Sequence, residues 1–471
     1  MLPSPVPLQL PAAVAVSLAY LSAGMVIGWS SPMVPELRKN TSHILITADQ
    51  GSWLASVGLL ASVPPSLLNG VLVDAVGRRW MLLFAAVPLL TVSVWQRFAT
   101  TFWELLASIV VGSVSASIIL PLAPVYLVEI AEDRIRGFLV SLGTLMQGVG
   151  SLLITAIGPK VSFFTVTEIM MVGPVLFVAI FWWMPESPYF LLAKHRKDEA
   201  TKALMRLRGK SSEKEVNDEL EAIQRGLEER SQKEISAADA FRELRRSARS
   251  RRIFMVSMAF ATFLVLGGVD AITANTMQIL VESDSSLDPQ LSAIGVSSCA
   301  VLSCAVFSLV VDRLGRRPLL LFSLGGCCVA TASLGVYFFL IVYASEGATD
   351  DIFWLPLASL IVFFVSFGMG PSSLLWVMPN ELVPPSLRVL TTTSVYVLAS
   401  LLGFSDTKLF QVVADTYGAF IPFWFFTMVS FLGFFFVWFF IPETRGRSLA
   451  DISSEMSVGP SPHRHKSSQP I

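Results

Sequence analysis

One short arrangement of charged residues, an aspartate followed by a glycine and two adjacent arginines, occurs twice in an otherwise apolar chain. In "VLVDAVGRRW" these residues are Asp74, Gly77, Arg78 and Arg79, and the same spacing returns 238 residues later in "LVVDRLGRRP". Carboxylates and guanidinium groups form strong ion pairs that can also be broken. The chemistry that this pattern favours is therefore reversible charge pairing. The second copy consists of Asp312, Gly315, Arg316 and Arg317.

Two further charged phrases are repeated in the same order. "VEIAEDRIRG" places Glu129 seven residues before Arg136, and "NELVPPSLRV" places Glu381 seven residues before Arg388. Three repeated phrases in one order indicate two similar halves in parallel orientation, and such halves can rock about a site between them. The third phrase, "PESP" at 185–188 and "PETRGR" at 442–447, contains Glu186 in its first copy and Glu443 in its second.

The elements that must position these charges are predicted to be membrane-spanning helices. The 471-residue chain has 53% hydrophobic and 15% charged residues, which is too apolar for a soluble protein of this size. A helix crosses the hydrocarbon core with about 20 apolar residues. We therefore predict an all-α membrane protein with twelve spans. The apolar stretches are 12–31, 51–73, 80–96, 105–128, 138–158, 161–184, 253–280, 291–311, 318–343, 352–377, 389–410 and 417–441.

The distribution of lysine and arginine predicts the orientation of these spans. Of the 34 Lys and Arg residues, 29 fall on the side that contains the termini and the 189–252 loop, and five fall on the other. Because basic residues concentrate on the cytoplasmic side, we expect both termini to be cytoplasmic. The first apolar stretch is too long for a signal-peptide core, so we expect it to be retained. The "NTS" sequon at Asn40 then lies outside, where it can be glycosylated.

The composition also divides the chain into four parts. Residues 1–184 and 253–441 are predicted to form two six-helix bundles, joined by a linker at 185–252 and followed by a cytoplasmic tail at 442–471. Acidic and basic residues mix along the linker, which favours solvated amphipathic helices; a lipid-facing basic surface is the alternative. All four cysteines fall inside apolar stretches, so they are predicted to be buried side chains, without a disulfide framework or a metal site.

These phrases resemble the signatures of a known family. "GVLVDAVGRR", "EIAEDRIRG", "PESPYFLL", "VVDRLGRR" and "PETRGRSL" are similar to the motifs of the sugar porters of the major facilitator superfamily. The resemblance spans nearly the whole chain and implies the major facilitator fold, with twelve helices in two six-helix pseudo-repeats. Within the family, "GMVIGWSSP" at 24–32 is most similar to the insect facilitative trehalose and hexose transporters.

The repeated acids and arginines are predicted to form a cytoplasmic gate. They can pair across the two halves when the inner side is shut, and they must separate when it opens. Exposed ion pairs contribute about 0.2–1 kcal/mol each, so half a dozen bias a two-state equilibrium without locking it. Charges that only mark the membrane boundary are the alternative, but the two-fold repeat with partnered acids favours the gate.

The resemblance also implies where a solute would bind, although this sequence departs from the family there. The sugar-binding glutamine of the family's fifth span aligns with Thr144, and Gln147 follows one turn later. With Ser141 and Ser151 they form a polar stripe on one helix face. Such a stripe lines a wet cavity or bonds to a neighbouring helix, and both interpretations remain open.

In the seventh span, the paired glutamines of the family align with Leu264 and Val265, and its asparagine aligns with Asp270. Acids inside a membrane are costly and usually functional. Asp270 could accept a hydrogen bond from a solute hydroxyl, couple transport to protons, or lie near the outer end of its span and meet water. The predicted substrate-binding set is Thr144, Gln147, Asp270, Trp376 and Asn380.

We therefore expect a facilitative carrier, or uniporter, of a small sugar or polyol in the plasma membrane. The proton symporters of the family have an aspartate in the first span where this chain has Met25, which favours uniport. A proton-coupled symporter and a non-transporting solute sensor are the alternatives. No Ser-His-Asp set, metal cluster or nucleotide-binding loop indicates an enzyme. We expect a monomer that works without a cofactor and without a nucleic-acid partner.

Overall fold

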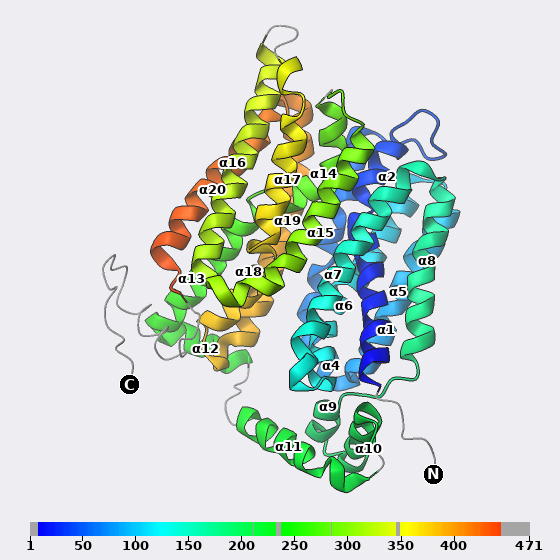
Figure 1. Cartoon of the computed structure of the whole chain (residues 1–471), viewed down its shortest axis with the longest axis vertical. Coiled ribbons are helices and arrows are strands. Elements are labelled where there is room, and N and C mark those ends of the chain that lie inside the picture. The colour runs from blue at the N-terminus through cyan, green and yellow to red at the C-terminus, as the bar shows by residue number, and fades with distance from the viewer. Residues whose placement is uncertain (1–7, 211, 232–236, 284, 345–348, 444–471) are drawn as a thin grey trace.

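The chain folds into two bundles of long helices with a smaller group of helices at one end (Figure 1). Within the described residues, twelve helical segments are long and apolar enough to cross a membrane, so the prediction of an all-α protein with twelve spans is confirmed. The computed structural model describes residues 8–210, 212–231, 237–283, 285–344 and 349–443.

The first six spans form one bundle, and helix breaks divide two of them. α4 begins directly after Ser62, and its first turn contains Pro64 and Pro65. Proline lacks a backbone N–H and is therefore accommodated in the first turn of a helix. The helices of this half are α1 (Gln9–Gly28), α2 (Ser30–Leu37), α3 (Ala48–Ala61), α4 (Val63–Val76), α5 (Arg78–Phe98), α6 (Phe102–Ile130), α7 (Asp133–Ile157) and α8 (Phe163–Phe181).

The last six spans form the second bundle, in which the seventh and tenth spans are broken. Gly268 separates α13 from α14 with a φ of 92°, a left-handed conformation that favours glycine. Its backbone packs on Phe426, because an added Cβ would fall 2.5 Å from that ring. The helices are α13 (Ala248–Val265), α14 (Val269–Glu282), α15 (Pro289–Leu314), α16 (Arg316–Tyr343), α17 (Leu355–Gly368), α18 (Pro371–Leu382), α19 (Arg388–Tyr417) and α20 (Phe420–Phe440).

A hydrophobic core fills each half separately. Tyr126 and Phe177 are fully buried in the first half, and Phe363 and Phe423 are fully buried in the second. Between the halves, α3 and α4 pack on α19, α7 packs on α15, and α2 packs on α14. The first span thus packs on its equivalent, the seventh, while the second packs on the eleventh and the fifth on the eighth. The last two contacts are exchanged when the halves are exchanged, so the interface has the approximate two-fold symmetry expected of parallel repeats.

The linker helices lie at one end of the molecule, which we call the linker end (Figure 1). The linker contains α9 (Pro188–Ala193), α10 (Lys197–Arg208), α11 (Asn217–Ser231) and α12 (Ala237–Arg246). Helices α9 to α11 share a small apolar core that includes Phe190, Leu204 and Leu220. α12 lies apart from them and packs on α13 and α19.

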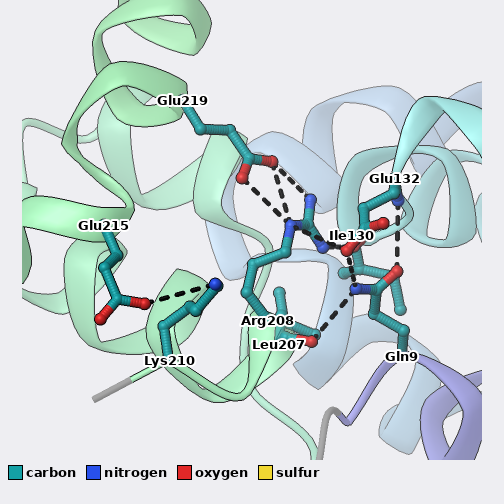
Figure 2. A network of polar contacts seen from close by, with 8 residues as sticks. All are labelled: Gln9, Ile130, Glu132, Leu207, Arg208, Lys210, Glu215 and Glu219. Carbon is teal, nitrogen blue, oxygen red and sulfur yellow. Dashed lines mark hydrogen bonds and ion pairs between the residues drawn. The ribbon is translucent and has the colours of Figure 1, made fainter. Parts of the chain in front are cut away.

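Arg208 attaches this linker to the first half (Figure 2). Its side chain is 8% exposed, donates to the Ile130 carbonyl at the end of α6 over 2.8 Å, and pairs with Glu219 of α11 at 2.5 Å. Gln9, at the start of α1, donates to Glu132 over 3.0 Å and to the Leu207 carbonyl over 3.2 Å. The start of α1 therefore lies at the linker end, against α10.

Candidate functional site

The predicted polar stripe on α7 divides into two parts. At the Ser151 end it faces α1, since an added Cβ on Gly28 would fall 2.5 Å from the Ser151 hydroxyl. Further along, α1 and α7 touch through backbone, because an added Cβ on Gly24 would fall 2.0 Å from the Gln147 carbonyl oxygen. Thr144 is exposed and Gln147 is partly exposed. Ser151 thus contacts a neighbouring helix, whereas the side chains of Thr144 and Gln147 are not buried.

Asp270 lies at the contact between the two halves. It occupies the first turn of α14, directly after the Gly268 break. An added Cβ on Gly403 of α19 would fall 2.4 Å from Asp270 Oδ2 and 3.2 Å from Leu59 Cδ1 of α3. Gly403 therefore leaves the space in which the Asp270 carboxylate packs between its own half and the other.

Trp376, on α18, belongs to a second polar group around α19. Its ring lies 5.5 Å from the ring of Tyr396, measured between centroids. The Tyr396 hydroxyl interacts with the Ser62 side chain of the first half, and Ser62 Oγ lies 3.1 Å from Ser400 Oγ. Tyr396, Ser400 and Gly403 follow one another at spacings of four and three residues, so they share a face of α19. Tyr396, which Trp376 contacts, and Gly403, on which Asp270 packs, are therefore about 10 Å apart along the axis of α19.

The same two helices, α3 and α19, also join the halves at the end opposite the linker. Lys408 Nζ lies 2.6 Å from Asp49 Oδ1 and 2.6 Å from Ser52 Oγ. The ammonium also sits 4.6 Å from the ring centroid of Trp53, a cation–π distance. Trp53 in turn contacts Phe404, with ring centroids 5.9 Å apart. We call this line of contacts, which ends at Ser62 and Ser400, the α3–α19 seam.

Sequence reasoning missed the seam and also missed Asp406. Asp406 and Lys408 both fall inside the predicted span at 389–410, and charged residues within a span are energetically costly and usually functional. That signal could have identified both of them. Asp49 and Ser62 carried no such signal, because they end or interrupt an apolar stretch as polar residues commonly do.

The charged repeat at the linker end has a well-defined role within each half. Glu186 Oε1 accepts hydrogen bonds from the backbone N–H groups of Arg78 at 3.1 Å and Arg79 at 3.0 Å. In the second half, Glu443 accepts from Arg316 N–H at 3.0 Å and Arg317 N–H at 3.1 Å. Each carboxylate thus caps the N-terminus of a helix, α5 or α16, and the helix dipole favours a negative charge there.

The glycine of each repeat makes room for this cap. Gly77 has a φ of 105° and Gly315 a φ of 87°, and added Cβ atoms would lie 2.5 Å from Glu186 Oε2 and 2.8 Å from Glu443 Oε2. The arginine that follows is equally repeated. Arg79 donates to the Trp182 carbonyl just beyond α8, and Arg317 donates to the Trp438 carbonyl in α20.

The structure places the remaining gate residues as follows. Arg78 pairs within the first half, at 3.2 Å from both Asp74 and Glu129. Glu129 and Arg136 line a cleft of about 520 Å³ between the first half and the linker. Arg388 begins α19. The side chains of Asp312, Glu381 and the predicted binding residue Asn380 lie outside the described part of the structure.

The loop with the sequon lies at the end opposite the linker. Asn40 is exposed between α2 and α3. His43, in the same loop, packs against Phe163 and Phe164 with tilted rings whose centroids lie 4.6 and 5.0 Å from the imidazole. Partial burial lowers the pKa of the His43 imidazole, opposed by a backbone hydrogen bond with Ala99. The neutral imidazole is therefore favoured.

Two similar six-helix halves with equivalent caps, joined along a seam of polar contacts, have the architecture of a membrane transport protein of the major facilitator fold, not of an enzyme. More specifically, the chain belongs to the sugar transporter family, because the family model described as "Sugar (and other) transporter" matches residues 12–456. The sequence-based assignment to this family is confirmed.

Named relatives and solved structures agree with this assignment. The chain is 28% identical over 450 residues to a facilitated trehalose transporter, Tret1, of Polypedilum vanderplanki, covering 95% of this chain and 88% of the relative. It is 30% identical over 452 residues to Tret1 of Apis mellifera ligustica, covering 94% and 87%. The inward-open xylose transporter XylE of E. coli superposes with a TM-score of 0.76 at 18% identity, covering 95% of this chain and 99% of XylE. This structural likeness confirms the fold.

Proposed function

We propose that the chain is a facilitative uniporter that carries a sugar or sugar-like solute by alternating access. The observation that carries this proposal is the α3–α19 seam, in which Asp49 and Lys408 join the two halves at one end through contacts that can break. Opening the seam and closing the linker end would expose a central solute first to one side and then to the other. Family membership supports the same cycle.

We propose that the linker end faces the cytoplasm and that the protein resides in the plasma membrane as a monomer. The 29-to-5 bias of lysine and arginine supports this orientation. Asn40, exposed at the other end, would then be accessible for glycosylation. On closure of the cytoplasmic side, the charged repeat is proposed to gain pairs across the halves in addition to those that it makes within each half.

We propose a solute of the trehalose and hexose class, bound by Thr144, Gln147, Asp270 and Trp376. The named trehalose transporters among the relatives support this class. Losing a buried hydrogen-bond partner costs about 1–3 kcal/mol. Because Leu264 and Val265 replace two amides of the family pattern, glucose is expected to bind more weakly than it does to typical sugar porters.

Solute counterflow in proteoliposomes tests this function. Labelled trehalose, glucose, fructose and myo-inositol would be offered to the wild type, to Gln147→Ala and to Gln224→Ala, which changes an exposed glutamine of α11. We expect counterflow of at least one solute, slowed by Gln147→Ala and not by Gln224→Ala. Absence of counterflow for every solute, combined with retained binding, would favour the sensor alternative. Equal rates in all three proteins would contradict the placement of the site.

Proton-coupled symport is the second candidate, and two acids within the spans favour it. Asp270 and Asp406 lie inside the seventh and eleventh spans, where an ionised group is costly. The two candidates differ in accumulation. Uniport predicts that a proton ionophore leaves uptake unchanged and that solute never exceeds its external concentration. Accumulation that the ionophore abolishes would establish symport.

A further inference from the structure

Asp270 and Asp406 approach each other from neighbouring turns of α14 and α19. The Asp270 carboxylate packs over Gly403, one helical turn before Asp406. The Asp406 carboxylate in turn lies beside the backbone N–H of Ala271, the residue next to Asp270. Asp270 of α14 therefore contacts α19 close to Asp406, and Asp406 of α19 contacts α14 close to Asp270. About 18 Å of α14 separates Asp270 from Glu282 at the end of the helix, so the pair lies deep within its spans.

The two carboxyl groups have different surroundings. Asp406 is 5% exposed, and its Oδ2 has no hydrogen-bond partner among the described residues. Asp270 is partly exposed and lies in the first turn of α14, where the helix dipole favours a negative charge. Two negative charges in a site of low dielectric repel strongly, so one of the two groups is expected to be neutral. The surroundings assign the charge to Asp270 and the proton to Asp406.

The charged groups on neighbouring helices do not neutralise this pair through any described contact. Lys408 is two residues from Asp406, but Asp49 and Ser52 hold its ammonium across the interface. α20 and residues 253–265 of α13 contain no ionisable side chain. Charged groups on these helices lie towards the helix ends, among them Glu282, Asp415 and Arg38 at one end, and Asp74, Arg249, Arg251, Arg252 and Arg388 at the other. The uncharged ionisable groups nearer the middle are the phenol of Tyr396 on α19 and the thiols of Cys299 and Cys304 on α15.

We propose that Asp270 and Asp406 form a proton-binding site that holds one proton, on Asp406 Oδ2, while α3, α14 and α19 are packed together. This proposal rests on the proposed transport cycle. In that cycle, the protonation of Asp406 is linked to whether the α3–α19 seam is closed or open. Opening of the seam admits water to Asp270 and Asp406 and allows both to ionise. Loss of the proton therefore favours the open seam, and transport slows at high pH because the return to the closed seam requires the proton.

The pH dependence of counterflow tests this link. The wild-type rate is expected to fall with rising pH by at most about tenfold per pH unit, the limit for one proton. Asp406→Asn, which cannot lose a proton, should transport without this fall. Asp270→Asn removes the neighbouring charge, so Asp406 should lose its proton at lower pH and the fall should begin earlier. The matched control is Asp415→Asn, an exposed acid of the same helix, which should keep the wild-type profile.

Infrared spectroscopy of the purified protein tests the site without requiring transport. A protonated carboxylic acid has a carbonyl band distinct from those of carboxylates. We expect Asp406→Asn to lose one such band and Asp415→Asn to keep it. An unchanged band in Asp406→Asn, or a wild-type pH profile in that variant, would overturn the proton site. If no solute is transported while the band behaves as expected, the proposed function fails and the proton site stands.

Discussion

The two ends of the molecule use the same kinds of charged group in opposite ways. At the end opposite the linker, Asp49 and Lys408 come from different halves and lie 2.6 Å apart. At the linker end, Arg78 pairs with Glu129 inside the first half, and Glu186, at the start of the linker, caps α5 of the same half. The first arrangement joins the two halves of the molecule, whereas the second stabilises one half. A contact between the halves influences which end of the molecule is open, and a contact inside one half contributes to the stability of that half.

This difference separates the expected effects of mutation. Variants at the linker end that disturb a cap should lower stability in both halves alike, because the cap is repeated. Variants along the α3–α19 seam should leave stability nearly unchanged and alter which end of the molecule is open. A seam variant that unfolds the protein would contradict this distinction. So would a cap variant that changes only the ratio of open to closed conformations.

The largest effect is expected for Gly77→Ala and Gly315→Ala. Each forces a side chain into a left-handed backbone and within 2.8 Å or less of the capping carboxylate. A strained backbone of this kind costs about 1–3 kcal/mol. The midpoint of thermal unfolding in detergent should fall by a similar amount in both variants. Gly70→Ala is the control, since nothing lies within 4 Å of its added Cβ. A wild-type midpoint in either glycine variant would show that the caps are not structural.

An intermediate effect is expected for Lys408→Met, which keeps the apolar stem and removes the ammonium. Loss of the contacts with Asp49, Ser52 and Trp53 should weaken the closed seam by about 1–2 kcal/mol. That corresponds to an increase of roughly 5- to 30-fold in the ratio of open to closed seam. Distances between spin labels at Leu45 and Tyr417, both exposed at this end, would measure the shift. Lys160→Met, at the same end, should leave the distances unchanged.

The smallest effect is expected for Ser400→Ala. It removes the 3.1 Å hydrogen bond to Ser62, a contribution of about 0.5–1.5 kcal/mol. The same label distances should move in the same direction as for Lys408→Met, but less. Ser405→Ala is a matched control, since its hydroxyl bonds to the Leu401 carbonyl within α19. Equal distances in the Ser400 and Ser405 variants would remove Ser62–Ser400 from the seam.

The sequence predicted the parts of this molecule that local physics determines. Length and hydropathy located all twelve spans, because a helix in lipid must satisfy its own backbone and cover itself with apolar side chains. The repeated phrases also revealed two similar halves. The capping role of Glu186 could not be deduced, since it acts on a backbone 107 and 108 residues away.

Contacts between the halves were not predictable in the same way. Asp49 and Lys408 are 359 residues apart, and no periodic pattern relates them. Asp406 is a different case, because the sequence alone places this acid inside the predicted 389–410 span, where an ionised side chain is energetically costly. The sequence does not reveal which group lies beside it. Its proximity to Asp270 emerges only when α14 packs on α19.

A disulfide across the seam tests the central claim, that the halves must separate there during each transport cycle. Ser62 and Ser400 face each other with hydroxyl oxygens 3.1 Å apart, close enough for cysteines at both positions to form a disulfide. Ser62→Cys combined with Ser400→Cys would be made with Cys299, Cys304, Cys327 and Cys328 replaced by serine. Counterflow should stop when a membrane-permeable oxidant closes the disulfide and should recover on reduction, while each single variant stays active. Counterflow at the uncross-linked rate in the fully oxidised double variant would contradict the account.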